Sequence, residues 1–529
     1  GGGMRYRLLE TVAEYAGERL EEAGERAATE RRHLAYYREL ARTTDPHLRG
    51  HGQVEAMARL DAEYGNLRTA LRRAVDAREE DEALVLVHSL LWYWQMRDLR
   101  TDALHGARAA AALGPDPFAP PAAPVVPLHE PCTAAPPPLS EEQRWEARRG
   151  VRLVELLNMD HDTGRWTTPE GVRRLREMTA VYRPGLPQTC RLPGSFAVFA
   201  VLLIGEAGRL REILDTTVEA CRRHGYEWEL ANALQQRANM FANRADLAAE
   251  ASADADESLK IFERLGDAWG AAEALSSRAE AHERLLRFEQ AGEDFAAAIG
   301  HAAKIGAQSQ MALLRARYAD ILIETGRTAE GEAILREILA GEHGRGHEPM
   351  LGARLFLALA LGRTGRLAEA REHLHALRAE FGSATLSLFE GFTLGCLSWL
   401  DNLEGRYRSA LDLAVEAYGR SLDPLSMMVA PQMPAVHAVA AAWALAGLGG
   451  PEARAGAVLL GARAGLLPEG HRSPSLEREN LEKATELCRS VLGEDAFTAA
   501  YAEGDGLSMD EAAALLGRAA DAIRARAES

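Results

Sequence analysis

Cysteine, lysine and long apolar runs are all scarce in this sequence of 529 residues, and each scarcity excludes a class of protein. The five cysteines form no CxxC pair, so neither a disulfide framework nor a zinc site is expected. The longest apolar run, at 196–204, is about half as long as a membrane-spanning helix requires, and no signal-peptide pattern is present. We therefore expect a cytoplasmic protein that has no contact with a membrane.

Positive charge is limited too, because 61 Lys and Arg residues stand against 78 Asp and Glu residues and leave a net charge of -17. Only Lys260, Lys304 and Lys483 are lysines. Nucleic acid repels an acidic surface unless positive charge is concentrated locally. No Lys/Arg block with interleaved aromatic residues occurs, so we expect no direct contact between this chain and nucleic acid.

Motifs of catalysis and cofactor binding are missing as well. No GxxxxGK[ST] loop occurs, so ATP binding through a P-loop is not expected, and there is no GxSxG elbow. His343 and His347 are separated by glycines that take them off a fixed helical face. Asp160, His161 and Asp162 form an acidic segment with no positioned partner. We therefore predict no enzyme, and no catalytic, cofactor-binding or metal-binding residue.

Helix-forming residues, by contrast, are abundant, and apolar residues recur along most of the chain at helical spacing. Within 311–339, two apolar helical faces flank a break at Gly326-Arg327, which predicts a helix hairpin of about 30 residues. Similar breaks recur about every 40 residues, at Gly208-Arg209, Ala245-Asp246, Leu286-Arg287, Gly365-Arg366 and Gly405-Arg406, with a weaker one at Gly449-Gly450.

Small residues keep register with these breaks. Seven residues before the break stand Ala238, Ala279, Ala319, Ala358 and Ser398, whereas the first hairpin has Val201. Small side chains allow two helices to pack closely. This register is typical of tetratricopeptide (TPR) repeats, with connections longer than in the usual unit of about 34 residues. The sequence therefore predicts an all-α superhelical array of TPR-like hairpins, an α-solenoid. A generic alanine-rich helical bundle is the alternative.

A proline-rich segment interrupts this pattern at 114–140, where ten prolines occur. Proline blocks helix formation, so we predict a linker or insertion between an N-terminal helical region, 1–113, and the repeat array, 141–529. A proline-rich motif for a partner is the alternative. Near the start, 5–9 predicts a short strand ahead of a helix at about 10–23. Because a strand without a partner is unstable, we expect its partner to lie upstream.

A ligand-binding face follows from the repeat. In a TPR-like hairpin the first helix lines the concave surface, and the positions 13, 10, 6 and 3 residues before the break lie on one helical face. Among these positions we predict a groove formed by Asn232, Gln235, Asn239, Glu273, Ser276, Glu280, Glu283, Asp320, Phe392, Trp399 and Asn402. Amides can pair with an extended peptide, and carboxylates favour a basic partner. An ordinary solvated face is the alternative.

Six segments together resemble one family of bacterial regulators. They are RYRLLETVAEYAGERLEEAGE at 5–25, RRH at 31–33, YY at 36–37, RLDAEYGNLRTAL at 59–71, LWYW at 91–94 and DAFTAAYAEGDGLSMDEAAALL at 495–516. The chain resembles the C-terminal TPR region of AfsR-like Streptomyces antibiotic regulatory proteins and of related STAND-class ATPase–TPR and LuxR-type transcription regulators. The resemblance covers 5–113 and the C-terminal tail, and between them it depends on the repeat register.

The resemblance implies a regulatory role. A winged-helix and nucleotide-binding part would precede this chain, and ATP or ADP would bind there. The array would receive a small molecule, a peptide or a protein as its signal, and it would restrain its own upstream switch and DNA-binding domains. The output would be transcription of antibiotic or other secondary-metabolite genes. A free-standing TPR scaffold is the second hypothesis, and an enzyme with a helical cavity is the third.

Overall fold

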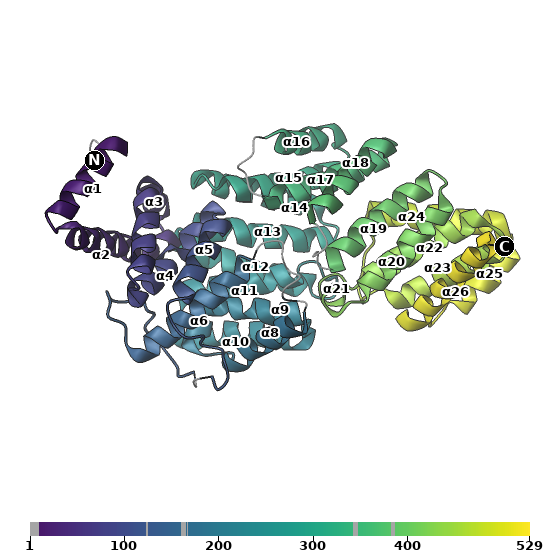
Figure 1. The fold of residues 1–529 in the computed structure, drawn as a ribbon. Helices are drawn as coiled ribbons and strands as arrows, with labels where there is room; N and C mark the ends of the chain where they lie inside the picture. The colour runs from purple at the N-terminus through teal and green to yellow at the C-terminus, as the bar shows by residue number, and fades with distance from the viewer. Residues whose placement is uncertain are drawn as a thin grey trace. The chain divides into compact units, whose positions relative to one another are not determined.

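The computed structural model describes residues 10–122, 125–159, 166, 168–341, 347–381 and 387–528. Throughout these ranges the regular structure is helical, which confirms the predicted all-α class (Figure 1). None of the described helices is long and apolar enough to cross a membrane. The predicted strand at 5–9, the acidic segment at 160–162 and the loop after His343 lie outside the described residues.

The chain divides into two compact units, one formed by 1–158 with 192–194 and the other by 159–191 with 195–529. This division differs from the predicted boundaries at 113–114 and 140–141. The reason is that the proline-rich segment packs on the N-terminal helices, where Phe118, Cys132 and Leu139 are buried. The Leu139 N–H also donates to the Asp81 carboxylate (3.0 Å). The segment is therefore part of the first unit.

The first unit consists of α1 (Glu10–Glu22), α2 (Arg26–Thr44), α3 (Gln53–Asp76), α4 (Glu80–Arg97), α5 (Arg100–Ala111) and α6 (Glu141–Leu157). Helix α4 is its centre, because most of its side chains are buried. Helix α6 joins it through ion pairs to the acidic first turn of α4, from Arg144 to Asp81 (2.6 Å) and from Arg148 to Glu80 (2.6 Å). These pairs explain why α6 belongs to this unit.

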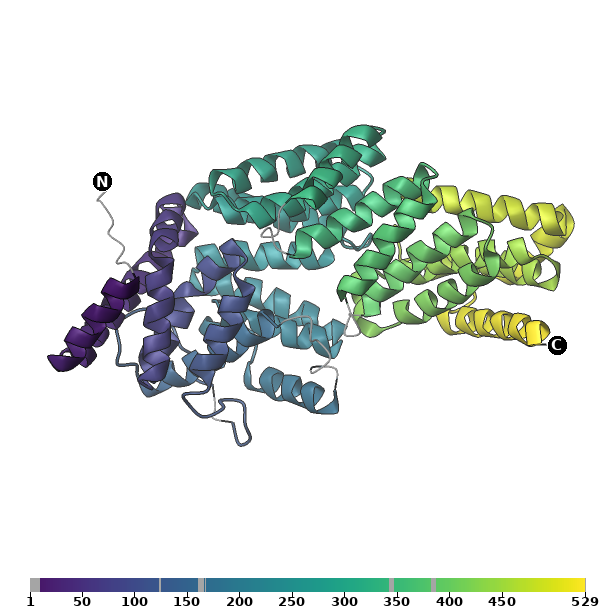
Figure 2. The ribbon, with the colours of Figure 1, turned by 45° about the horizontal axis from the view of Figure 1, so that its top comes forward.

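The second unit begins with α8 (Pro169–Val181) and continues as a succession of antiparallel helix pairs (Figure 2). The pairs are α9 (Ala197–Ile204) with α10 (Ala207–His224), α11 (Glu227–Phe241) with α12 (Ala248–Leu265), α13 (Ala268–Arg284) with α14 (Phe288–Lys304), α15 (Gln308–Glu324) with α16 (Thr328–Ala340), α17 (His347–Arg363) with α18 (Leu367–Phe381), α19 (Ser387–Leu403) with α20 (Tyr407–Ser421), and α22 (Met433–Leu448) with α23 (Gly450–Leu466). A short helix, α21 (Pro424–Val429), lies between the last two pairs, and α24 (Ser475–Leu492), α25 (Glu494–Glu503) and α26 (Met509–Glu528) follow. The predicted array of TPR-like hairpins is confirmed.

Left-handed backbone marks the turns of these hairpins. Gly326, Gly365 and Gly405 have φ of 88°, 80° and 73°, a conformation that glycine adopts without strain. Leu286 takes the same conformation (φ 58°) at its predicted break. The first break was predicted three residues too late, because Gly208 lies inside α10 and the chain turns at Gly205 (φ 78°).

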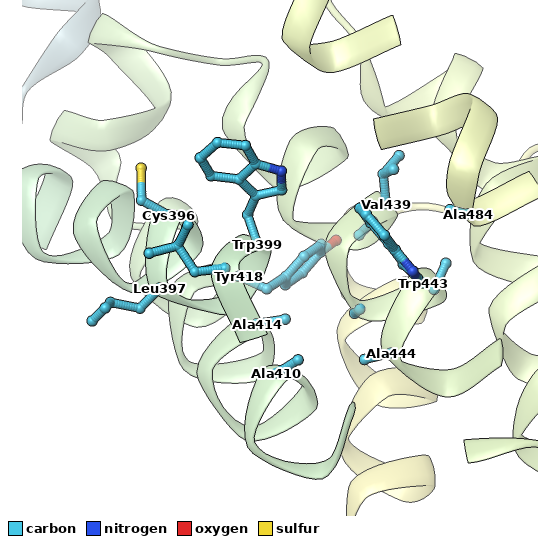
Figure 3. Close-up of a cluster of buried hydrophobic side chains, with 14 of the residues drawn as sticks. Cys396, Leu397, Trp399, Ala410, Ala414, Tyr418, Val439, Trp443, Ala444 and Ala484 are labelled. Carbon is cyan, nitrogen blue, oxygen red and sulfur yellow. The ribbon is translucent and has the colours of Figure 1, made fainter. Parts of the chain in front are cut away.

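The small residues lie where the paired helices pack. Ala238, Ala279, Ala319, Ala358 and Ser398 are all buried, as the register predicts. At Gly331 an added Cβ would lie 2.6 Å from the Ala319 carbonyl oxygen, so only glycine allows α15 and α16 to approach this closely. In the C-terminal hairpins, large aromatic side chains fill the space between alanines, as Trp399, Tyr418 and Trp443 do (Figure 3).

Candidate ligand-binding face of the helix-hairpin array

The predicted groove residues lie on the first helices of the hairpins, and the structure buries more of them than expected. Asn239 is exposed, and Glu273, Ser276, Glu283, Asp320 and Phe392 are half-buried. The expectation of a solvent-exposed position is wrong for the buried residues Asn232, Gln235, Glu280, Trp399 and Asn402. Their burial follows from the stacking of the hairpins, in which α11 packs against α13 and α19 packs against α22.

The amide side chains show this effect most clearly. The Gln235 amide donates to the Ser277 hydroxyl on α13 (3.3 Å), and the Asn402 amide donates to the Ala440 carbonyl on α22 (2.9 Å). Gln310 donates to the Glu273 carboxylate (2.5 Å) in the same way, from α15 to α13. These amides connect neighbouring hairpins, so their donors are engaged within the array.

Carboxylates from α13 and α15 gather into one cluster, which we call the acidic face and define as Glu280, Glu283, Asp320 and Glu324. Two arginines lie within ion-pair distance of it. Arg317 lies 3.3 Å from Glu280, and Arg363 on α17 lies 2.7 Å from Glu324. The sequence predicted Glu280, Glu283 and Asp320 for this groove, and the structure brings all three together.

Burial and mutual repulsion shape the protonation of the acidic face. Burial raises the pKa of the Asp320 carboxyl well above its ordinary value, and the carboxylates of Glu283 and Glu324 raise it further. Burial also raises the pKa of Glu283. In turn, the Glu280 carboxylate raises the pKa of the Arg317 guanidinium. Both shifts favour the protonated, uncharged carboxyls, so a cation placed beside Glu283 and Asp320 would favour their charged forms.

Glu324, Arg317 and Arg363 were not predicted as site residues, although the sequence holds a signal for two of them. Glu324 and Arg363 occupy the same register position, two residues before the breaks at Gly326 and Gly365. Opposite charges at one register position in consecutive hairpins indicate an ion pair between the hairpins.

In the part of the chain that the structure describes, no group of three or more His, Cys, Asp or Glu side chains is placed to hold a metal ion.

Helix α24 borders the acidic face, although it lies far away in the sequence. The Ser475 hydroxyl donates to the Glu324 carboxylate, and Arg363 donates to Glu479 (2.9 Å). Further along α24, the Lys483 ammonium lies 5.6 Å from the ring centroid of Trp443 on α22. The N-terminal half of α24 thus crosses the ends of α15 and α17 and continues over α22.

The comparisons with known proteins leave the family open. No protein-family model matches the chain, and no curated protein matches it. Among solved structures, the chain is similar to a chain of the APC/C hetero-tetramer Cut9-Hcn1, with 12% identity and a TM-score of 0.31 over 92% of this chain and 95% of that one. The repeat architecture stated above therefore follows from the helix pairs of the chain itself.

Proposed function

We propose that this chain is a protein-interaction array that binds a basic segment of a partner against the acidic face. The observation that supports the proposal is the excess of carboxylates there over the arginines Arg317 and Arg363. An Arg or Lys side chain placed against Glu283 and Asp320 would relieve their repulsion and would lower the raised pKa of Asp320. Binding should therefore release protons and strengthen as the pH rises.

The test is the binding of a fluorescently labelled oligoarginine peptide, measured by anisotropy, with an oligoglutamate peptide for comparison. In the double variant Glu283→Gln/Asp320→Asn we expect affinity to fall roughly five- to thirtyfold, because each lost charge of a half-buried pair is worth about 0.5–1 kcal/mol. Raising the salt should reduce the difference between the variant and the wild type.

The matched control removes two carboxylates from the same region at exposed positions. Glu289 and Glu293 lie exposed on α14, the second helix of the same hairpin. The variant Glu289→Gln/Glu293→Gln has the same net charge as the test variant, so we expect it to bind the peptide within about twofold of wild type. Equal loss in both variants would mean that only the overall charge attracts the peptide, and the proposed site would be refuted.

We further propose that the array is the regulatory module of a larger STAND-type transcription regulator. Support comes from the resemblance of 5–113 and of the C-terminal tail to that class of regulators. A partner bound at the acidic face would shift the upstream switch only by its different affinity for the two switch states. The alternative is a free-standing TPR scaffold.

The intact mass of the native protein distinguishes these two roles. The protein would be captured from its source lysate with an antibody against this chain, whose own mass is 57.5 kDa. A native chain longer by two or more domains, each of about 100–200 residues, is the expected result. A native mass near 57.5 kDa would refute the regulator and favour the scaffold.

A further inference from the structure

We infer that α24 is a clamp for the bound partner, so that a basic segment on the acidic face tightens the docking of α24. This inference rests on the proposed function and extends it to regulation. Ser475 contacts Glu324, which lies 151 residues away in the sequence. Glu479 contacts Arg363, which lies 116 residues away. The fold has therefore brought the start of α24 to the border of the acidic face.

Arg363 couples the acidic face to α24, because its side chain pairs with a carboxylate on each. One of its terminal nitrogens lies 2.7 Å from Glu324 on α15, and the other lies 2.9 Å from Glu479 on α24. A single guanidinium thus serves two carboxylates that would otherwise repel each other. When a partner supplies positive charge next to Asp320 and Glu324, Arg363 becomes available to Glu479, and the contact between α17 and α24 strengthens.

Helix α24 is held lightly enough to respond to this change. Only Ala484 and Cys488, both in its C-terminal half, are fully buried, and they pack into the large hydrophobic core of the C-terminal hairpins. By contrast, α22 buries twelve of its sixteen residues. The N-terminal half of α24 depends on Ser475, Glu479, Lys483 and partly buried leucines, so it should open at low free-energy cost.

The segment ahead of α24 connects it to α23. It runs from Leu467 to Pro474 between α23 and α24, and Gly470 has a left-handed backbone (φ 73°). His471 within it lies 2.8 Å from Glu477, which ties this segment to the first turn of α24. Arg463 on α23 donates to the Ser473 hydroxyl (2.5 Å), so the segment is a fixed connection about which the N-terminal half of α24 can open.

A competing geometry makes the opposite prediction, and this makes the inference testable. If α24 were an internal competitor, a basic peptide would displace it and expose its amides. If α24 is a clamp, the peptide protects them. Hydrogen exchange of the α24 amides in the intact chain, with and without saturating oligoarginine peptide, separates the two. We expect exchange at 475–483 to slow by about threefold or more, and faster exchange would overturn the inference.

The peptide affinity of the variant Glu479→Gln is a second test, because the clamp and the competitor predict changes in opposite directions. Without this carboxylate, α24 should loosen, Arg363 should be free to neutralise Glu324, and peptide affinity should fall about two- to fivefold. A competitor released by the same change would instead raise affinity. Glu486 lies exposed on the same helix two turns further along, so Glu486→Gln removes an equal charge and should change neither readout.

The results also separate this inference from the proposed function. If the wild type binds the peptide and Glu283→Gln/Asp320→Asn does not, the acidic face is the site. Unchanged or tighter binding by Glu479→Gln would then overturn the clamp alone. If the wild-type chain fails to bind oligoarginine at low salt, the proposed function is refuted, and the clamp is refuted with it.

Discussion

Arg278 should be the most sensitive charged residue of hairpin α13/α14, because it joins three helices. Its guanidinium donates to Asp294 on α14 (2.5 and 3.0 Å) and to Asp256 on α12 (2.5 Å). The Asp294 side chain is only 8% exposed, so replacing Arg278 by methionine leaves a buried carboxylate without its main partner. The uncompensated buried charge would cost part of the folding free energy.

The loss of folding free energy depends on the contacts that Asp294 keeps in the variant. Removing one partner of a buried pair costs about 3–5 kcal/mol. Arg278 is 22% exposed, and His282 Nδ1 still lies 3.1 Å from Asp294. We therefore expect about 2–3 kcal/mol for Arg278→Met, which corresponds to roughly 30- to 150-fold faster exchange of the protected amides in α13 and α14.

Hydrogen exchange is the suitable assay, because repeat proteins open locally and each unit depends on its neighbours. The control is Arg327→Met, since Arg327 pairs with Glu330 at the surface, where 53% and 59% of the two side chains are exposed. That change should cost less than about 0.5 kcal/mol. Adding Asp294→Asn to Arg278→Met should recover part of the loss. Equal effects of the two arginine variants would refute the argument.

Three further predictions concern the same array. Because the folded-state pKa of Asp320 is raised, the wild type should lose stability as the pH rises through that pKa. In urea unfolding, Asp320→Asn should therefore be more stable than the wild type at pH 8, and the difference in free energy of unfolding should shrink toward pH 4. Gly331→Ala should destabilise by about 1–3 kcal/mol because of the contact with Ala319, whereas Gly300→Ala, in an open position on α14, should stabilise by about 0.5–1 kcal/mol. Asp267 caps α13 at the Gly270 N–H (2.9 Å) and accepts from Trp228 (2.7 Å), so Asp267→Ala should cost about 2–4 kcal/mol in urea unfolding and Asp267→Ser distinctly less.

Local chemistry explains which parts of the fold were predictable. A helix break needs a residue that tolerates left-handed backbone, so the breaks at Gly326, Gly365 and Gly405 were visible in the sequence. The first break was misplaced because Gly208 is followed by arginine, like the other three glycines. Gly205 is followed by Glu206, but it is the residue whose N–H closes the end of α9.

Long-range packing explains what was missed. Helical periodicity places Glu280 and Glu283 on one face of α13, but it says nothing of a helix that returns from far along the chain. Ser475 and Glu479 reach the acidic face only because α24 packs over α22, which the order of the repeats does not require. The folding of the proline-rich segment onto the first unit was missed for the same reason, since Leu139 and Asp81 are 58 residues apart.

The acidic face arises where the repeat departs from its own pattern. Arg237 and Arg278 each stand eight residues before a predicted break, and each pairs with aspartates of its own second helix and of the preceding one. In the next hairpin that position is Tyr318, and the arginine has moved one residue earlier, to Arg317. One residue is a rotation of about 100° on a helix, which turns the guanidinium away from the second helix and toward Glu280. The same side chain that fastens two hairpins internally therefore becomes, one position away, a partner for the carboxylates of the acidic face.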